Sequence, residues 1–357
     1  MKGWERMASV GILTFLHNEN YGSALQAYAL QRAVREAGFE CEHLDYRPDR
    51  AEKVRNLLRS GNSPKLILDG LRKRGVKAEQ AQARRKSRAI PDFYARHMRL
   101  SAPCRNGAEL REAGKKHGIL LCGSDQIWNP VWLNENYFLT FAEPGQRKMA
   151  YAASLGISSL QSRTKAGKIR RWTADFEAVS VREEEGAALM ERMTGKRPDV
   201  MPDPVCLLSA EEWGGIAAEA PAGGGYLLCY FIGENESYWE EVRRLARETG
   251  LRVLVIPVTA ESYRSGYELL GGIGPEGFLG AVRGAVRLVT DSFHGLVFGT
   301  IFGVPVTPLR RDREGDPESK HSRVENFLRL AESRGIGEMR EEGRTWIAEK
   351  LIMKNEQ

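Results

Sequence analysis

Short apolar segments that alternate with amphipathic helical segments are the feature of this sequence that most constrains its fold. An apolar run rich in β-branched residues at 9–16 is followed by a polar loop, a helical pattern at 23–37 and another strand pattern at 40–46. A strand, a helix and a strand in this order predict a parallel pair with a right-handed crossover. The pattern returns later, with strands expected at 118–122, 149–155, 178–181, 226–232, 251–257, 286–290 and 304–308.

The helical segments and one proline-rich stretch divide this alternation into two halves. Helices are expected at 165–176, 182–193, 238–248, 278–282, 294–302, 323–331 and 345–352. Two prolines at 200–204 disfavour helix and indicate a linker. Since 357 residues exceed one ordinary core, we predict an α/β protein with two Rossmann-like doubly wound domains facing a cleft. The expected domains are 1–204 and 205–338, followed by a C-terminal helix at 339–357.

Residues 47–100 differ from the rest of the chain in their charge. They carry 16 basic and 5 acidic residues, a net charge of +11, whereas the other 303 residues carry −5 and the whole chain +6. We expect a basic insert of two or three solvated helices in the first domain, broken at Pro64 and Pro91. Its aromatic residues are only Phe93 and Tyr94, so it lacks the stacking platforms of a nucleic-acid binder, and no nucleic-acid partner is expected. A solvated helical face and peripheral contact with an anionic membrane stay open as interpretations.

Composition and motifs argue against a membrane-spanning, secreted, disulfide-bonded or metal-binding protein. No apolar run is long enough to cross a bilayer, and the first residues lack the apolar region of a signal peptide, so a cytoplasmic protein is expected, with the inner membrane face as a peripheral site. The five cysteines are scattered and odd in number, which favours reduced, buried thiols. No local metal-binding motif occurs, so no metal is expected.

Four polar loops follow predicted strands, at 18–23, 123–129, 182–186 and 291–295. In open α/β sheets, ligands bind at the carboxyl ends of strands, where helix N-termini present free N–H groups. His294 would lie on the first turn of a helix, either as an acid or base near neutral pH or as a packed residue beside an N-cap formed by Asp291 or Ser292. Arg182 would bind an anion or form an ordinary pair with a nearby glutamate.

Taken together, residues 20–30, 123–130, 180–183, 203–205 and 290–295 resemble the polysaccharide pyruvyl transferase family, in its order and spacing. The resemblance implies a GT-B-like fold. It also implies transfer of a pyruvyl group from phosphoenolpyruvate to a sugar of an exopolysaccharide precursor, forming a ketal across two hydroxyls. The expected partners are phosphoenolpyruvate, as co-substrate rather than cofactor, and a glycan or lipid-linked oligosaccharide acceptor. No other cofactor is implied.

The resemblance also assigns roles to residues. Catalysis is expected of His294 and Arg182. Donor binding falls to the 205–338 domain, with Ser292, Gly295, Arg313 and Arg323. Acceptor binding is expected of Asn20, Tyr21, Gly22, Ser124 and Asp125. Many members have an arginine where this chain has Ser292, and the candidates to replace it are Arg310, Arg311, Arg313, Lys320 and Arg323.

The sequence is also compatible with two other functions. A glycosyltransferase of the same fold would use a nucleotide-sugar donor; many retaining members carry a Glu-x7-Glu signature, and the nearest pair here, Glu318 and Glu325, is one residue short. A non-catalytic protein would bind anionic glycans or lipid through the basic insert.

Overall fold

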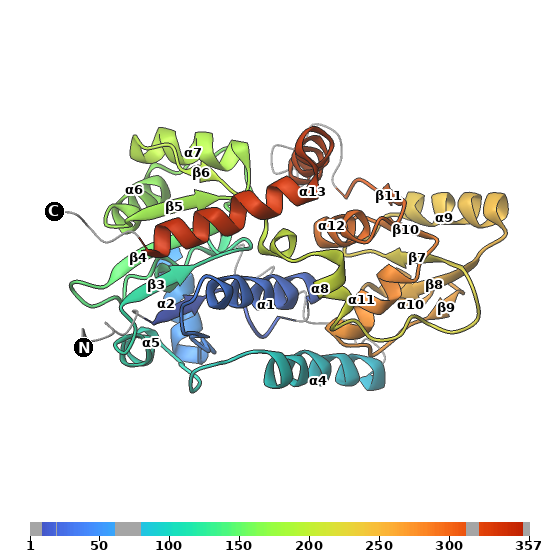
Figure 1. Cartoon of the computed structure of the whole chain (residues 1–357), viewed down its shortest axis with the longest axis horizontal. Helices are drawn as coiled ribbons and strands as arrows, with labels where there is room; N and C mark the ends of the chain where they lie inside the picture. The colour runs from blue at the N-terminus through green and yellow to red at the C-terminus, as the bar shows by residue number, and fades with distance from the viewer. Residues whose placement is uncertain (1–8, 19, 61–79, 312–320, 353–357) are drawn as a thin grey trace, which may run out of the picture.

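The computed structural model describes residues 9–18, 20–60, 80–311 and 321–352. The elements form two α/β units side by side, and the last helix crosses from the second unit back to the first (Figure 1). Pro64 and Arg313 lie outside the described residues, as do the side chains of residues 80–87 and Arg323. No helix within the described ranges is long and apolar enough to cross a membrane.

The first unit contains a six-stranded sheet with the order β2-β1-β3-β4-β5-β6, in which every pair is parallel. Its strands are β1 (Val10–Leu13), β2 (Cys41–His43), β3 (Ile119–Cys122), β4 (Arg147–Ala153), β5 (Ala178–Val181) and β6 (Asp199–Val200). β1, β3 and most of β4 are buried, which explains why they read as continuous apolar runs rather than alternating ones.

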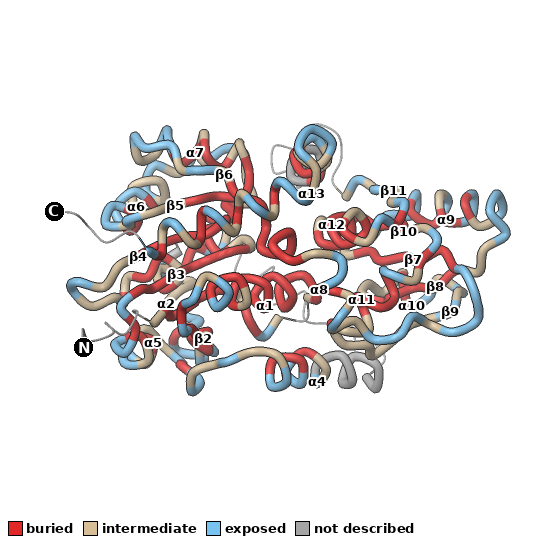
Figure 2. Tube along the Cα trace, viewed as in Figure 1, coloured by how far each residue is buried: buried red, intermediate tan, exposed pale blue. Residues whose placement is uncertain are grey.

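The second unit contains a five-stranded parallel sheet with the order β11-β10-β7-β8-β9. Its strands are β7 (Tyr226–Tyr230), β8 (Arg252–Ile256), β9 (Glu268–Leu269), β10 (Arg287–Thr290) and β11 (Val306–Pro308). Two parallel sheets with crossover helices confirm the predicted fold class of two Rossmann-like domains. Buried backbone runs through the middle of both units (Figure 2).

Helices and short 3-10 turns connect these strands. They are α1 (Tyr21–Glu36), α2 (Arg50–Ser60), α4 (Gln80–His97), α5 (Gly107–Gly114), η2 (Pro130–Trp132), η3 (Glu135–Phe138), α6 (Arg163–Thr173), α7 (Glu184–Thr194), η4 (Pro204–Leu207), α8 (Ala210–Gly214), α9 (Glu236–Thr249), α10 (Ala260–Tyr263), α11 (Pro275–Arg283), α12 (Phe293–Ile301) and α13 (His321–Ile352). Asn20 caps α1 by accepting a hydrogen bond from the N–H of Gly22, and Ser292 caps α12.

The basic insert differs from the expected solvated helices. Ile90, Phe93 and Tyr94 of α4 are buried, and α4 packs against α1 and α11. Pro91 lies inside α4, so the predicted break there is wrong. Glu276 on α11 accepts from Arg96 and contacts His97 at 3.1 Å. The second half of the insert is therefore a packed link between the two units (Figure 1).

The C-terminal helix α13 also joins the two units. Gly335 has non-helical angles (φ 77°, ψ 153°) and kinks the helix. Beyond the kink, Trp346 packs against Tyr151 of β4 with ring centroids 5.6 Å apart, and its Nε1 donates to Asp199 at 2.7 Å. The first sheet ends at β6 and the second begins at β7, with η4 and α8 between them; the division at 204/205 stays a prediction.

Candidate functional site

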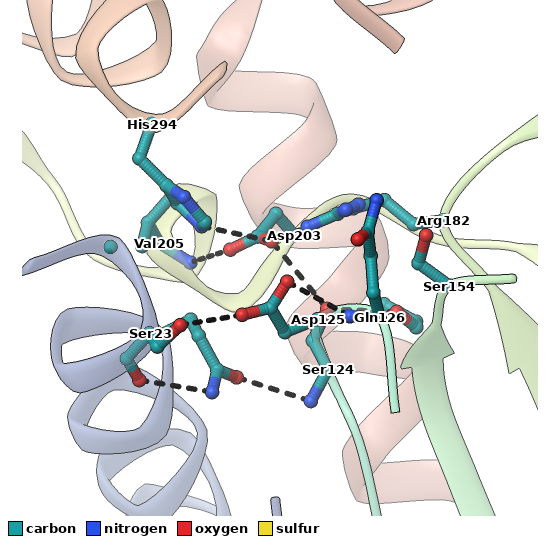
Figure 3. Close-up of polar contacts among 12 residues, drawn as sticks. Ser23, Ser124, Asp125, Gln126, Ser154, Arg182, Asp203, Val205 and His294 are labelled. Atoms are coloured by element: carbon teal, nitrogen blue, oxygen red, sulfur yellow. Dashed lines mark hydrogen bonds and ion pairs between the residues drawn. The ribbon is translucent and has the colours of Figure 1, made fainter. Parts of the chain in front are cut away.

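Asp203 is the centre of a buried polar cluster that draws on both units (Figure 3). It caps η4, and its Oδ1 accepts from the backbone N–H of Val205 at 3.1 Å. Its Oδ2 accepts from Nη1 of Arg182 at 2.6 Å and lies 3.5 Å from Nε2 of His294. Burial would raise the pKa of Asp203, but the adjacent His294, Arg182 and the Val205 N–H together lower it, so this carboxyl is ionised.

Arg182 directly follows β5 and is buried, with 3% of its side chain exposed. Its Nε donates to Glu183 at 3.0 Å, and its Cζ lies 4.6 Å from the ring centroid of Phe293. Burial would lower the pKa of Arg182, but the charges of Glu183 and Asp203 raise it. Its Nη2 is buried and has no hydrogen-bond partner among the described residues. A buried N–H of this kind is costly unless a ligand accepts from it.

His294 lies on the first turn of α12, as predicted, and 9% of its side chain is exposed. Its Nε2 also has no hydrogen-bond partner in the part of the chain that the structure describes. The imidazole lies against Gly22 on α1, where a Cβ would come within 2.1 Å of Nδ1. Gly22 is therefore a close-approach position for the histidine, because any larger residue would displace the ring.

Ser292 and Gly295 have structural roles at the start of α12. The Oγ of Ser292 accepts from the N–H of Gly295 at 3.3 Å, so Ser292, not Asp291, is the N-cap. A Cβ at Gly295 would lie 2.7 Å from Oγ1 of Thr290. Asp291 instead accepts from the N–H groups of Ile232 and Gly233, each at 2.7 Å. These contacts fix the N-terminus of α12 against the end of β7.

The predicted acceptor residues separate into two groups. Asn20 and Asp125 line a cavity, and the Oδ2 of Asp125 accepts from Ser23 at 2.6 Å. Ser124 is fully buried and its Oγ donates to the carbonyl of Ala152.

Tyr21 is 1% exposed and packs between the units. Its hydroxyl donates to Ile273, and its ring stacks on Phe278 with centroids 5.0 Å apart. Tyr21 and Ser124 are both buried and bonded to other parts of the protein, and their contact with an acceptor stays a prediction.

A cavity of about 120 Å³ lies beside this cluster. Its lining residues come from both units: Asn20, Asp125, Gln126, Ile232, Asp291, Ser292, Phe293, His294, Leu309, Arg311 and Val324. The Nε of Arg311 donates to Oδ2 of Asp291 at 3.0 Å. Of the two described cations suggested to replace the usual arginine, Arg310 and Arg311, only Arg311 lines this cavity. Arg313, Lys320 and the side chain of Arg323 lie outside the described residues.

Asp203 and Glu183 were missed as site residues by reasoning from sequence. Asp203 lies in a stretch interpreted as a linker because prolines flank it. An acidic residue directly before a proline is also a helix N-cap signal, and this signal was available. Within the described residues, no group of three His, Cys, Asp or Glu side chains is arranged to hold a metal ion.

Solved structures share the fold of this chain. A UDP-GlcNAc 2-epimerase from Neisseria meningitidis, bound to UDP-GlcNAc, superposes with a TM-score of 0.52 at 11% identity, covering 96% of this chain and 99% of that one. A putative UDP-N-acetylglucosamine 2-epimerase from Listeria monocytogenes gives 0.51 at 13% identity, covering 96% and 94%. This similarity supports the GT-B-like arrangement of the two domains.

No curated protein matches the sequence. The sequence pattern of one family, described as polysaccharide pyruvyl transferase, matches residues 20–313, which include every loop of the site described above. Since the match covers most of the chain, this protein is a transferase that belongs to the polysaccharide pyruvyl transferase family.

Proposed function

We propose that this protein transfers the pyruvyl group of phosphoenolpyruvate to two hydroxyls of a sugar in a polysaccharide precursor and releases phosphate. The observation that carries the proposal is the pairing of a buried guanidinium, Arg182, and an imidazole, His294, with the single carboxylate of Asp203. The family match supports a polysaccharide acceptor. The donor and the reaction are what membership of this family suggests, and the arginine and histidine of the site are compatible with them.

Individual hydrogen-bond donors, rather than a large net positive charge, support binding of an anion at this site. Arg182 and Arg311 are each already paired with carboxylates, so the site has no large positive excess. The N-terminus of α12 reaches the cavity with Ser292, Phe293 and His294, and such a terminus favours negative charge. The unpartnered Nη2 of Arg182 adds a charged donor behind Phe293.

The chemistry requires proton transfer in both directions, for which an imidazole is suited. Protonated His294 gives its proton to C3 of phosphoenolpyruvate, and positive charge develops at C2. A sugar hydroxyl adds to C2 and returns a proton to the imidazole. The bond from C2 to the phosphate oxygen then breaks, with its electrons leaving on phosphate. The second hydroxyl adds to C2 and its proton leaves with the phosphate, which completes the ketal.

Asp203 and Arg182 would assist these steps electrostatically. The carboxylate of Asp203, 3.5 Å from Nε2 of His294, orients the imidazole for proton transfer. Arg182 stabilises the charge that develops on the departing group, in a position where water is excluded. Both residues are held by buried contacts, so little reorganisation is needed.

Phosphate release from phosphoenolpyruvate, measured with a panel of methyl pyranosides, tests the reaction. We expect release only when a suitable glycoside is present, and its loss in His294→Ala. His117→Ala is the matched control: His117 is also buried, but it precedes β3 at the end of the sheet opposite the site. Equal activity of His294→Ala and His117→Ala would refute the assigned role.

Ligand binding separates this proposal from a nucleotide-sugar glycosyltransferase. Phosphoenolpyruvate at about 100 times its dissociation constant should stabilise the fold by about 2.7 kcal/mol, whereas nucleoside diphosphates should not. Arg182→Lys should abolish this stabilisation, because an ammonium cannot present the guanidinium fork. Stabilisation by nucleoside diphosphates and not by phosphoenolpyruvate would favour the glycosyltransferase.

A further inference from the structure

Helix α2 buries a charged side chain and exposes two apolar ones. Glu52 is 3% exposed, and its Oε1 accepts from the hydroxyl of Tyr46 at 3.2 Å and from Nδ2 of Asn136 at 2.8 Å. Asn56, one turn later, donates to the same Tyr46 hydroxyl at 3.1 Å. On the outer side, Val54 is 56% exposed and Leu58 is 73% exposed. A helix on a water-facing surface normally shows the reverse pattern.

Basic side chains surround this outer stripe. At 100° per residue, Val54 and Leu58 share one face, with Lys53 on one flank and Arg55 on the other. Arg50 begins the helix, and all three of these basic residues are exposed. The only acidic residue of α2, Glu52, is buried and turned inward. Arg55 pairs with Glu52 at 2.8 Å and Arg59 pairs with Glu135. Among the described residues of α2, Arg50 and Lys53 therefore supply the positive charge beside the two exposed apolar side chains.

An exposed tryptophan connects this surface to the candidate site. Trp132 is 46% exposed and belongs to η2, which lies beside α2. Its Nε1 donates to the backbone carbonyl of Gln126 at 3.2 Å, and Gln126 lines the cavity. Helix α2 contacts η2, and η2 is connected to the cavity through the loop that contains Gln126.

We propose that the outer face of α2, together with Trp132, docks this protein on an anionic lipid membrane. Helices that lie in a membrane interface combine an apolar stripe with basic flanks, and indole rings favour the same depth. Each basic residue near an anionic surface strengthens binding, while one valine and one leucine alone bind weakly. Within the described part of the 47–100 insert, we assign docking to α2, because α4 packs against α1 and α11.

Self-association through this face is disfavoured by its charge. A symmetric dimer would bring the same patch of both copies together, and the basic flanks would then oppose one another. A membrane with anionic headgroups satisfies both the apolar stripe and its basic margins. Docking on a membrane does not depend on the proposed reaction. Its purpose would be to present a lipid-linked acceptor to the cavity, and that purpose rests on the proposed function.

Vesicle co-sedimentation of the full chain tests the proposal without any substrate. We expect binding to vesicles of equal parts phosphatidylcholine and phosphatidylglycerol at low salt, weakening near 0.5 M salt as charges are screened (a Debye length of roughly 4 Å). Pure phosphatidylcholine should bind far less. Val54→Asp with Leu58→Asp should weaken binding at least about tenfold. Arg50→Gln and Lys53→Gln should each weaken it about fivefold.

Val286→Asp is the matched control, because Val286 is 49% exposed and lies in the second unit, just before β10. It should leave binding unchanged, and unfolding midpoints should show that all variants fold. No binding of the wild type to the anionic vesicles would overturn the proposal. So would equal losses in the α2 and Val286 variants, or a dimer in light scattering that Leu58→Asp abolishes. Phosphate release with a soluble glycoside should be the same in the α2 variants and the wild type.

Discussion

His294 and Asp203 face one another with Nε2 3.5 Å from Oδ2, although 91 positions of sequence separate them. His294 belongs to α12 of the second sheet, whereas Asp203 precedes η4 in the connection between the two sheets. Arg182, from the end of β5 in the first sheet, binds the same carboxylate oxygen. The cluster therefore exists only when both units are assembled, and it couples their packing to the proposed chemistry.

Asp203→Asn should destabilise the fold and abolish activity. The substitution leaves the buried Arg182 with Glu183 as its remaining carboxylate partner, and breaking a buried ion pair typically costs about 3–5 kcal/mol. Urea unfolding at neutral pH measures the loss. Asp92→Asn on the exposed side of α4 is the control and should change stability by less than about 0.5 kcal/mol.

The same substitution should change the response to acid. The folded-state pKa of Asp203 is lowered below its unfolded value of about 3.9. Its ionised form therefore contributes stability that is fully present above about pH 5 and is lost as the pH falls through 4 and below. Asp203→Asn should lose less stability than the wild type between pH 5 and pH 2. Parallel losses in the two proteins would contradict the lowered pKa.

Gly22→Ala should inactivate the protein with little global unfolding. The new Cβ would lie 2.1 Å from Nδ1 of His294, so the imidazole must move away from Asp203. Loss of phosphate release is the readout. Gly167→Ala in α6 is the control, because no atom lies within 4 Å of a Cβ there. It should keep full activity and gain about 0.4–1 kcal/mol of stability. An active Gly22→Ala protein would show that the ring position is not required.

Phe93→Ala should be strongly destabilising, even though Phe93 lies in the basic insert. Its ring is fully buried and packs against Tyr28 of α1 with centroids 5.7 Å apart. Truncation of a buried phenylalanine costs about 3–5 kcal/mol. Val54→Ala on exposed α2 should cost less than about 0.5 kcal/mol. Chemical unfolding measures the free energy of unfolding of both variants. Similarly small losses in the two would indicate that the basic insert is solvated rather than packed.

The native protein should react slowly with thiol reagents. All five cysteines are free and buried, and burial raises the pKa of Cys41 to about 12 and raises that of Cys104 as well. Thiols react as thiolates, so both access and ionisation are disfavoured. The reaction with a chromogenic disulfide reagent, followed by absorbance, should be slow for the folded protein. It should reach five thiol equivalents after denaturation. Fast release of one equivalent before denaturation would indicate an exposed thiol.

The local pattern of apolar residues and helix caps in the sequence predicted more of the fold than of the candidate functional site. Strands such as β3 and β7 and helices such as α9 are visible in sequence because apolar spacing and caps depend on nearby residues. The same loops also pointed to Arg182 and His294. Burial was less predictable: Tyr21 was expected at an acceptor but stacks on Phe278, because the partner ring comes from the other unit.

The sequence by itself therefore determined two parallel α/β units, their polar loops and the family, since each depends on residues that are near in the chain. Only the tertiary structure decided which loops meet. It placed Asp203 between Arg182 and His294, buried Ile90, Phe93 and Tyr94 of α4, and left Val54 and Leu58 of α2 exposed. The physical reason is that these outcomes depend on contacts between distant segments, and local periodicity carries no information about which distant surface covers a given side chain.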